Sequence, residues 1–523
     1  MGGTRHFHAA MMLAWKSPNI WGAGGAAVIA AILAPGAIAQ TVSQQPPTTA
    51  FFAVYPDDQG SVQTNTPDPS INTKNPFFDP SIGINGQACV TCHEPFTGIT
   101  ITVPFINQQF NASGGTDPLF RFNNTANNPS FGSPTAANYS VFLSHGTART
   151  AKTVPATKNF TVVAANALTN MLFAAGDTPT NNMFPLMNDP QHRGTPTLSL
   201  FRRPLINTNV NFDSAVLWDG RESIEDMPLQ ASHAIQTMLL GAGTDPAVNN
   251  ALANFMTGVY TDQTASNVVG QLTRNGATGG VGNLVALSQS PSRPCVDDPA
   301  GNLTSFVLAV SSPTLCTKVT VGAQPGGVFS LFDSWKSLSP KTFADQLSVA
   351  RGQAVFNRTG CIFCHTVPNL GNNASAGAPG FKRDGTESPS IMQTVLTAVQ
   401  ATGSPKEIQR VQEMIDRNNE LPLYCLRPTS DTSSTACGSH ATDVVTTDPG
   451  RAMVTGQIAD AGMFKPPILR NLPVRAPFFH AGVAADSPAG SAMEHLVTFY
   501  NFRFGFGLSS ADQADLVNFL NAL

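Results

Sequence analysis

The sequence has few charged residues. Only 12% of its 523 residues are Asp, Glu, Lys or Arg, and the net charge is −4. We therefore expect no nucleic-acid partner, because such binding needs Lys and Arg concentrated against the phosphates. Tyr and Trp are also scarce, at five and four residues, whereas Phe numbers 33. Phe suits the apolar lining of a large planar cofactor, and equally any ordinary core.

The first forty residues predict export. Arg5 and Lys16 precede an apolar Gly/Ala-rich run, and small residues follow it up to Ala39. This order is typical of a signal peptide, residues 1–39, cut after Ala39, which would place the body of the protein in the periplasm. The alternative is an uncleaved membrane anchor, because the apolar run is nearly long enough to span a bilayer.

Cysteine is rare, at eight residues, yet four of these form two C-x-x-C-H stretches. They are Cys89-Val90-Thr91-Cys92-His93 and Cys361-Ile362-Phe363-Cys364-His365. In this pattern two thiols one helical turn apart can each add to a vinyl group of one porphyrin, and the adjacent His binds the iron. We therefore predict two covalently attached haem c groups, with His93 and His365 as proximal ligands. A redox dithiol or half of a zinc site is the alternative, although no second C-x-x-C lies near either motif.

The four remaining cysteines form two sequence-local pairs, Cys295 with Cys316 and Cys425 with Cys437. Each pair would close a loop rich in Ser, Thr, Pro and Asp. We predict two structural disulfides, each stabilising the fold by roughly 3 kcal/mol. Disulfides are consistent with an exported protein.

Length and composition predict several domains with long loops. A chain of this length exceeds one ordinary core, and its 44 Gly and 40 Pro favour turns around short helices. We predict a mainly α fold of two cytochrome c-like haem domains with long loops, the N-terminal one expanded by insertions. The expected segments are an extended N-terminal arm at 40–85, an N-terminal haem c domain at 86–335 and a C-terminal cytochrome c domain at 336–523.

Local patterns predict individual elements. A strand is expected at 160–164 and an apolar helix at 224–240, interrupted near Pro228. Further helices are expected at 342–356 and at 391–418, the latter split in two at Gly403-Ser404-Pro405. A terminal helix should begin at Ser510, with Gln513 completing a capping box.

The function of each haem depends on what lies across the iron from its proximal His. A Met, His or Tyr there gives an electron carrier, whereas an open position binds peroxide or dioxygen. For the second haem the candidates are Met463, His480, Met493, His495 and Tyr500. For the first they include His145, His192, His233 and Met238. The residues alone leave these alternatives open, and any one of them is more often an ordinary packed side chain.

Four stretches together carry a family resemblance. They are the two haem motifs, Leu217-Trp218-Asp219-Gly220-Arg221, and the tail Phe464-Lys465-Pro466-Pro467-Ile468-Leu469-Arg470-Asn471 with Ala476-Pro477-Phe478-Phe479-His480-Ala481-Gly482. The chain thereby resembles the bacterial di-haem cytochrome c peroxidase and MauG family. The resemblance runs from residue 89 to about 520, but the loops at 100–190 and 240–335 match nothing in it.

The resemblance implies a division of labour between the haems. The first would be peroxidatic, with an open or openable distal side, and the second six-coordinate and used for electron transfer. Trp218 would lie between the haems and carry electrons or holes. In this family the distal ligand of the second haem lies downstream of the F-H-x-G motif, as Met in peroxidases and Tyr in MauG-like members, and Tyr500 stands there here. We expect Lys465 and Arg470 to pair with haem propionates; the alternative is that they are surface charges.

Two features depart from the family pattern. Relatives carry a Glu in the first distal pocket, where it moves the peroxide proton, but residues 234–238 here contain no carboxylate. Gln236 or Thr237 could orient peroxide and His233 could act as base. The family's inter-haem calcium uses an Asn that is replaced here by Gly194, leaving the backbone carbonyls of Arg475 and Pro477 as remaining ligands.

We thus predict an exported peroxidase-like oxidoreductase that reduces hydrogen peroxide at the first haem. Its partner would be a small redox protein donor, or a protein or organic substrate oxidised in the MauG manner. The alternatives are a non-catalytic di-haem electron carrier and a haem oxygenase that uses dioxygen on an apolar substrate. Membrane association is expected only if the N-terminal segment stays uncleaved.

Overall fold

The computed structural model describes residues 52–57, 59–127, 134–166, 197–213, 215–289, 294–297, 317–320, 330–365, 381–433, 438 and 440–523. The predicted signal peptide, His192, Gly194, Cys316 and Cys437 lie outside these residues. Cys425 is disulfide-bonded, whereas Cys89, Cys92, Cys361 and Cys364 are in no disulfide. No helix within the described ranges has the length and hydropathy needed to cross a membrane. The described residues form one compact unit.

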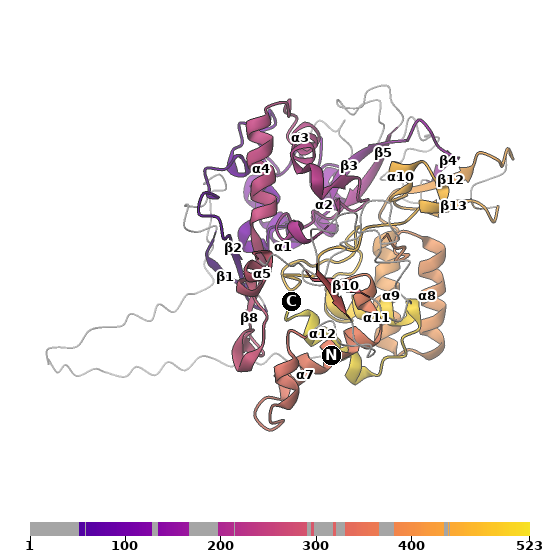
Figure 1. Ribbon diagram of the computed structural model, residues 1–523. Helices are drawn as coiled ribbons and strands as arrows, with labels where there is room; N and C mark the ends of the chain where they lie inside the picture. Colours follow the sequence, from indigo (N-terminus) through magenta and orange to yellow (C-terminus); the bar gives the residue numbers. More distant parts are fainter. Residues whose placement is uncertain are drawn as a thin grey trace, which may run out of the picture. The chain divides into compact units, whose positions relative to one another are not determined.

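The described fold mixes helices with small sheets, so the expected mainly α architecture is only part of it (Figure 1). The helices are α1 Val103–Ser113, α2 Ser140–His145, α3 Met227–Met238, α4 Pro246–Gly258, α5 Val281–Ser288, α7 Ala344–Arg358, α8 Pro389–Thr402, α9 Pro405–Asn418, α10 Ala452–Thr455, α11 Ala492–Phe504 and α12 Ser510–Leu520. The strands are β1 Val54–Asp57, β2 Gly60–Asn65, β3 Ala148–Thr153, β4 Phe160–Asn166, β5 Thr197–Arg202, β6 Ala215–Val216, β7 Glu222–Ser223, β8 Tyr260–Ser266, β9 Gly270–Gln271, β10 Pro294–Asp297, β11 Thr317–Thr320, β12 Leu423–Pro428 and β13 Val444–Thr446.

The sheets join segments that lie far apart in the sequence. One has the order β1-β2-β8-β9, so part of the predicted extended arm is a hairpin paired with β8. Another has the order β13-β12-β4, in which the expected strand at 160–164 runs antiparallel to β12 (Figure 1). The pairs β3-β5, β6-β7 and the parallel β10-β11 complete the described sheets. Backbone pairing therefore crosses the predicted boundary at 335.

Local chemistry explains where the helices begin. Pro228 lies in the first turn of α3 and starts that helix rather than interrupting it, because the first turn does not need its missing N–H. The expected break between α8 and α9 is present, with Ser404 and Glu407 forming a capping box. In α12 the capping residues are Ser509 and Asp512, one residue earlier than predicted, because the cap precedes the first helical residue.

Two large apolar clusters surround the two C-x-x-C-H motifs. One contains Phe77, Phe78 and Phe255 and contacts Cys89. The other contains Trp335, Phe356 and Phe519, draws residues from both predicted domains, and contacts Cys361. Each motif is thus set against its own apolar interior, which helices and loops of very different sequence position build together.

Helix α7, which leads into the second motif, lies directly against α12. A Cβ on Gly352 would be 1.9 Å from the Asp515 carbonyl oxygen, so only glycine permits this approach. The Arg351 guanidinium pairs with the Asp515 carboxylate at 2.6 Å, and the Phe356 and Phe519 rings meet at 5.4 Å. This contact fixes the direction in which the chain enters Cys361.

Candidate functional site

The two motifs adopt the same backbone conformation. Cys89–Thr91 and Cys361–Phe363 each form one turn of 3-10 helix. In both, the amide of the motif His donates to the carbonyl of the first Cys, at 3.1 Å for His93 and 3.0 Å for His365. The C-x-x-C-H spacing therefore brings two thiols and one imidazole onto a single turn at each site.

Both imidazoles are oriented by a backbone carbonyl. Nδ1 of His93 lies 3.0 Å from the Ile99 oxygen, and Nδ1 of His365 lies 3.1 Å from the Pro467 oxygen. When Nδ1–H donates in this way, the lone pair is on Nε2, which is the arrangement found in metal-binding histidines. Burial lowers the pKa of His93 to about 4, so this ring is neutral at pH 7 and able to donate its lone pair to a metal.

The thiols do not resemble those of a redox dithiol. Burial raises the pKa of Cys89 and of Cys92 to about 12, and that of Cys361 to about 11. A reactive dithiol needs the opposite shift, because the thiolate is the nucleophile. No group of three or more His, Cys, Asp or Glu in the described chain is arranged to hold a metal ion. These observations give no support to a redox dithiol or to a zinc site at the motifs.

The first motif opens on a cavity of about 2210 Å³, part of which is open to solvent. Cys89, Cys92 and His93 line it together with six basic side chains: Arg149, Lys152, Arg202, Arg203, Arg221 and Lys465. The Lys152 ammonium has no hydrogen-bond partner in the described part of the chain. Burial and the charge of Arg221 lower its pKa to about 8. An excess of buried positive charge beside an apolar space suits a planar ligand that carries carboxylates.

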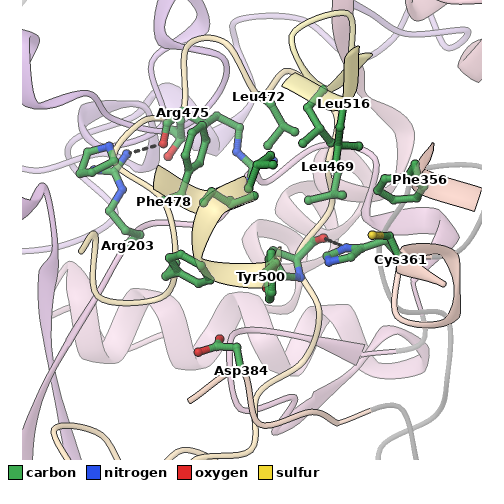
Figure 2. Close-up of a pocket in the computed structure, with 18 of the residues that line it drawn as sticks. Arg203, Phe356, Cys361, Asp384, Leu469, Leu472, Arg475, Phe478, Tyr500 and Leu516 are labelled. Carbon is green, nitrogen blue, oxygen red and sulfur yellow. Dashed lines mark hydrogen bonds between the residues drawn. The ribbon is translucent and has the colours of Figure 1, made fainter. Parts of the chain in front are cut away.

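The second motif opens on a cavity of about 1000 Å³, shown in Figure 2. Cys361 and His365 line it with an apolar shell that includes Phe356, Leu469, Leu472, Phe478 and Leu516. These side chains come from α7, α12 and the segment between α10 and α11. The apolar lining matches the faces of a porphyrin.

Two buried arginines also line the second cavity. Arg203 donates to the carbonyls of Gly146, Ile101 and Arg475, and Arg475 donates to those of Ile468 and Arg470. Among the described residues, neither has a carboxylate partner. Burial lowers the pKa of Arg203 to about 9, helped by the charge of Arg475, and lowers that of Arg475 to about 10. Two desolvated guanidinium groups that lack a counter-ion fit the propionates of a haem.

Trp218 lines both cavities. The indole Nε1–H donates to the Arg203 carbonyl at 2.7 Å, and the ring meets Phe464 and His480 edge-on at 6.4 and 6.2 Å. The side chain is 8% exposed. An aromatic ring in van der Waals reach of both spaces is thus held in one orientation.

A buried ion cluster fixes the loop that carries Trp218. Arg202 donates to Asp448 through Nε at 2.6 Å and Nη2 at 2.9 Å, and to Asp219 through Nη1 at 2.7 Å. Arg221 donates to both oxygens of Asp219. Although burial raises the pKa of Asp219, the charges of Arg221 and Arg202 hold it well below its usual range. The cluster joins β5, the Trp-Asp-Gly-Arg loop and the segment after β13.

The predicted ligand Tyr500 lies in the second cavity with His365. Its ring stacks on Phe504 at 5.6 Å, and its hydroxyl has no hydrogen-bond partner among the residues described. Burial and the charge of Asp384 raise the pKa of Tyr500 well above its usual value. The hydroxyl therefore stays protonated unless a cation faces it.

Most of the other ligand candidates lie outside both cavities. His480 stacks on Phe464 at 4.2 Å. His495 uses Nδ1 with the Ser491 carbonyl and Nε2 with Glu413, and His145 uses Nδ1 with the Ala481 carbonyl and Nε2 with Glu420. None of these three histidines, nor Met463 or Met493, lines either cavity. Met238 and His233 line the first.

The two predicted propionate partners are already paired. Lys465 lines the first cavity, but its ammonium lies 2.7 Å from Asp213. Arg470 pairs with Asp262 at 3.0 Å and lines neither cavity. The structure instead points to Lys152, Arg203 and Arg475, which sequence reasoning missed because no local pattern marks them.

The three residues predicted for the distal pocket of the first haem do not all line the first cavity. Thr237 and His233 line the first cavity, whereas Gln236 does not, because its amide donates to Ser232 and to the Ala242 carbonyl. Of the two carbonyls considered as remaining calcium ligands, that of Arg475 accepts from the Arg203 guanidinium at 3.3 Å. A neighbouring guanidinium charge does not favour a cation there.

Neither a scan against protein-family models nor a comparison with curated proteins gives a match to this chain. Its function is therefore argued from the site.

Proposed function

We propose that this chain is an exported di-haem c-type oxidoreductase that reduces hydrogen peroxide, with a small redox protein as electron donor or a protein or organic molecule as the oxidised substrate. The observation that carries the proposal is the duplicated site. Two C-x-x-C-H turns of equal geometry face two separate apolar cavities, and one tryptophan lines both.

The residues around each cavity fit a haem. The thiols of Cys89, Cys92, Cys361 and Cys364 would hold it covalently, and His93 and His365 would bind the iron. Lys152, Arg203 and Arg475 offer positive charge to its propionates. When bound, c-type haem supplies an iron centre able to take up peroxide and to exchange electrons.

The protein's own contribution is orientation and insulation. The carbonyls of Ile99 and Pro467 fix the tautomer and direction of the two proximal rings. Trp218, held by the Arg203 carbonyl, provides an aromatic path between the two spaces. Tyr500, which lines the second cavity and whose hydroxyl has no hydrogen-bond partner among the described residues, would help to hold the haem iron there. That assignment leaves the first cavity, which is the larger of the two at about 2210 Å³ against about 1000 Å³, for peroxide.

Haem attachment can be tested by counting. The full chain, exported in a bacterium that attaches c-type haem, should show two haems per chain in an alkaline pyridine spectrum. Cys89→Ser/Cys92→Ser and Cys361→Ser/Cys364→Ser should each retain one. A wild-type count of zero, or a haem that extracts into acid butanone, contradicts the proposal.

A di-haem electron carrier is the rival function, and Met238 favours it because this residue, a possible iron ligand, lines the first cavity. The ferric absorption spectrum separates the two. We expect a high-spin component that changes within seconds of adding stoichiometric peroxide. Wholly low-spin ferric haem, unchanged by peroxide, would establish the carrier instead.

A further inference from the structure

A histidine–glutamate pair borders the first cavity. Nδ1 of His233, on α3, lies 2.9 Å from Oε1 of Glu222, on β7. Both residues line the same cavity as His93. The side chain of His233 is 45% exposed and that of Glu222 11%. The pair thus touches the cavity on one side and solvent on the other.

The geometry leaves one imidazole nitrogen available. Nδ1–H donates to the carboxylate, so the lone pair is on Nε2, and within the described part of the chain Nε2 has no partner. Glu222 is held by the pairing of β7 with β6, where it lies opposite Val216. A fixed carboxylate that orients an imidazole and sets its tautomer is the arrangement by which a His becomes an effective general base.

We propose that His233 is the proton-transfer group for peroxide in the first cavity and that Glu222 is its positioning residue. This inference rests on the proposed function. Reduction of hydrogen peroxide to two waters takes up two electrons and two protons, and the electrons come from the redox-protein or organic donor. Nε2 of His233 removes the proton from one peroxide oxygen and delivers it to the other, so that this oxygen leaves as water when the O–O bond breaks. The other oxygen becomes the second water by taking up the two donor electrons and two protons from solvent.

Neighbouring residues do not offer this chemistry. The Thr237 hydroxyl donates to the His233 carbonyl, and a hydroxyl is not a base at neutral pH. Gln236 is turned towards Ser232 and does not line the cavity. The described chain holds two more His–Glu contacts, His145 with Glu420 at 3.0 Å and His495 with Glu413 at 2.9 Å, but neither pair borders either cavity. His233 therefore differs from His145 and His495 in its place beside the first cavity, and not in having a glutamate partner.

Cyanide association with the ferric protein tests the proposal without catalysis. Hydrogen cyanide must lose its proton to bind, so a base in the cavity speeds its association, which is followed by absorption. We expect His233→Ala to slow cyanide association and the bimolecular peroxide reaction by about 100-fold, the usual contribution of a general base. Added imidazole should restore much of both rates, because the site is open to solvent.

Glu222 and a matched control complete the test. Glu222→Gln should slow both reactions, because an amide lacks the charge and no longer fixes the tautomer of His233, and Glu222→Asp should recover part of the loss. Glu413→Gln makes the same change in the His495 pair and should alter neither rate. The haem content and ferric spectrum of each variant are first compared with those of the wild type. If His233→Ala loses haem, His233→Gln is used in its place.

The outcomes separate the two proposals. Wild-type rates for cyanide and peroxide in His233→Ala or His233→Gln overturn the role of His233, and an equal effect of Glu413→Gln overturns the role of position. If the wild-type protein holds two haems and its cyanide association depends on His233, but it never reacts with peroxide, then His233 is a base and the proposed peroxidase function is wrong.

Discussion

Replacing Asp448 by Asn should destabilise the protein strongly although it changes almost no volume. Arg202 and Arg221 balance Asp219 and Asp448 in the buried cluster, and the side chains of Arg202, Asp219 and Asp448 are 5%, 0% and 2% exposed. In Asp448→Asn one positive charge is left without its counter-ion. Breaking a buried pair by removing one partner costs about 3–5 kcal/mol. Because Asp219 still faces Arg202, we expect the lower end of that range.

Urea unfolding followed by far-UV circular dichroism measures this loss. With a slope of about 3 kcal/mol per molar urea, a loss of about 3 kcal/mol lowers the midpoint by about 1 M. The double variant Arg202→Leu/Asp448→Leu removes both charges and leaves Asp219 with Arg221. It should be more stable than Asp448→Asn, because no unpaired charge remains.

Two results would refute the reasoning about the cluster. An Asp448→Asn midpoint within 0.2 M of wild type, against the expected shift of about 1 M, would mean that water reaches Arg202 and screens it. A double variant at least as unstable as Asp448→Asn would mean that packing, rather than charge balance, holds β5 to the segment after β13.

Three further predictions concern other parts of the molecule. Gly352→Ala should lower the unfolding free energy by about 1–3 kcal/mol, because the new Cβ would meet the Asp515 carbonyl. Gly282→Ala is the control and should have no such effect, because a Cβ there would meet nothing within 4 Å. Equal urea midpoints for the two variants would contradict this prediction. The Asp219 carboxyl has a pKa near 3.8 in the unfolded chain and a lower pKa in the folded protein, so ionised Asp219 stabilises the fold fully above pH 3.8 and progressively less as the pH falls. The difference in unfolding free energy between wild type and Asp219→Asn should therefore become smaller below pH 3.8. A difference that stays constant with pH would exclude this linkage. Tyr500→Phe should alter the spectrum of the second haem and leave that of the first, and an unmoved spectrum would make Tyr500 an ordinary core residue.

Short-range signals in the sequence were sufficient for much of the secondary structure. The break between α8 and α9 follows from Gly403-Ser404-Pro405, and the turn at each C-x-x-C-H motif follows from its spacing. The hairpin β1-β2 was missed because its residues are mostly polar and it becomes a sheet only by pairing with β8, nearly two hundred residues later. Alternation within so short a segment carries too little information to predict such a partner.

The candidate site divides in the same way. The candidate haem ligands could be read from the C-x-x-C-H motifs. Glu222 directly follows the Trp-Asp-Gly-Arg stretch, but only the folded structure shows that it pairs with His233. The ion pairs of the two cations predicted to meet propionates could not be foreseen. Lys465 and Arg470 stand in a recognisable stretch, but Asp213 and Asp262, more than two hundred residues earlier, already neutralise them. Arg203 and Arg475 become distinctive only when folding buries both without a carboxylate.

The carbonyls that orient the histidines of the two C-x-x-C-H motifs differ in their distance along the chain. His93 finds its partner Ile99 six residues away, whereas His365 depends on Pro467, 102 residues later. In the proposed exported di-haem protein, the first turn can close almost at once as the chain leaves the export channel, but the second must wait for a long loop to close, at a larger entropic cost. If the chain holds two haems as proposed, the haem at the first motif should consequently be attached before the haem at the second.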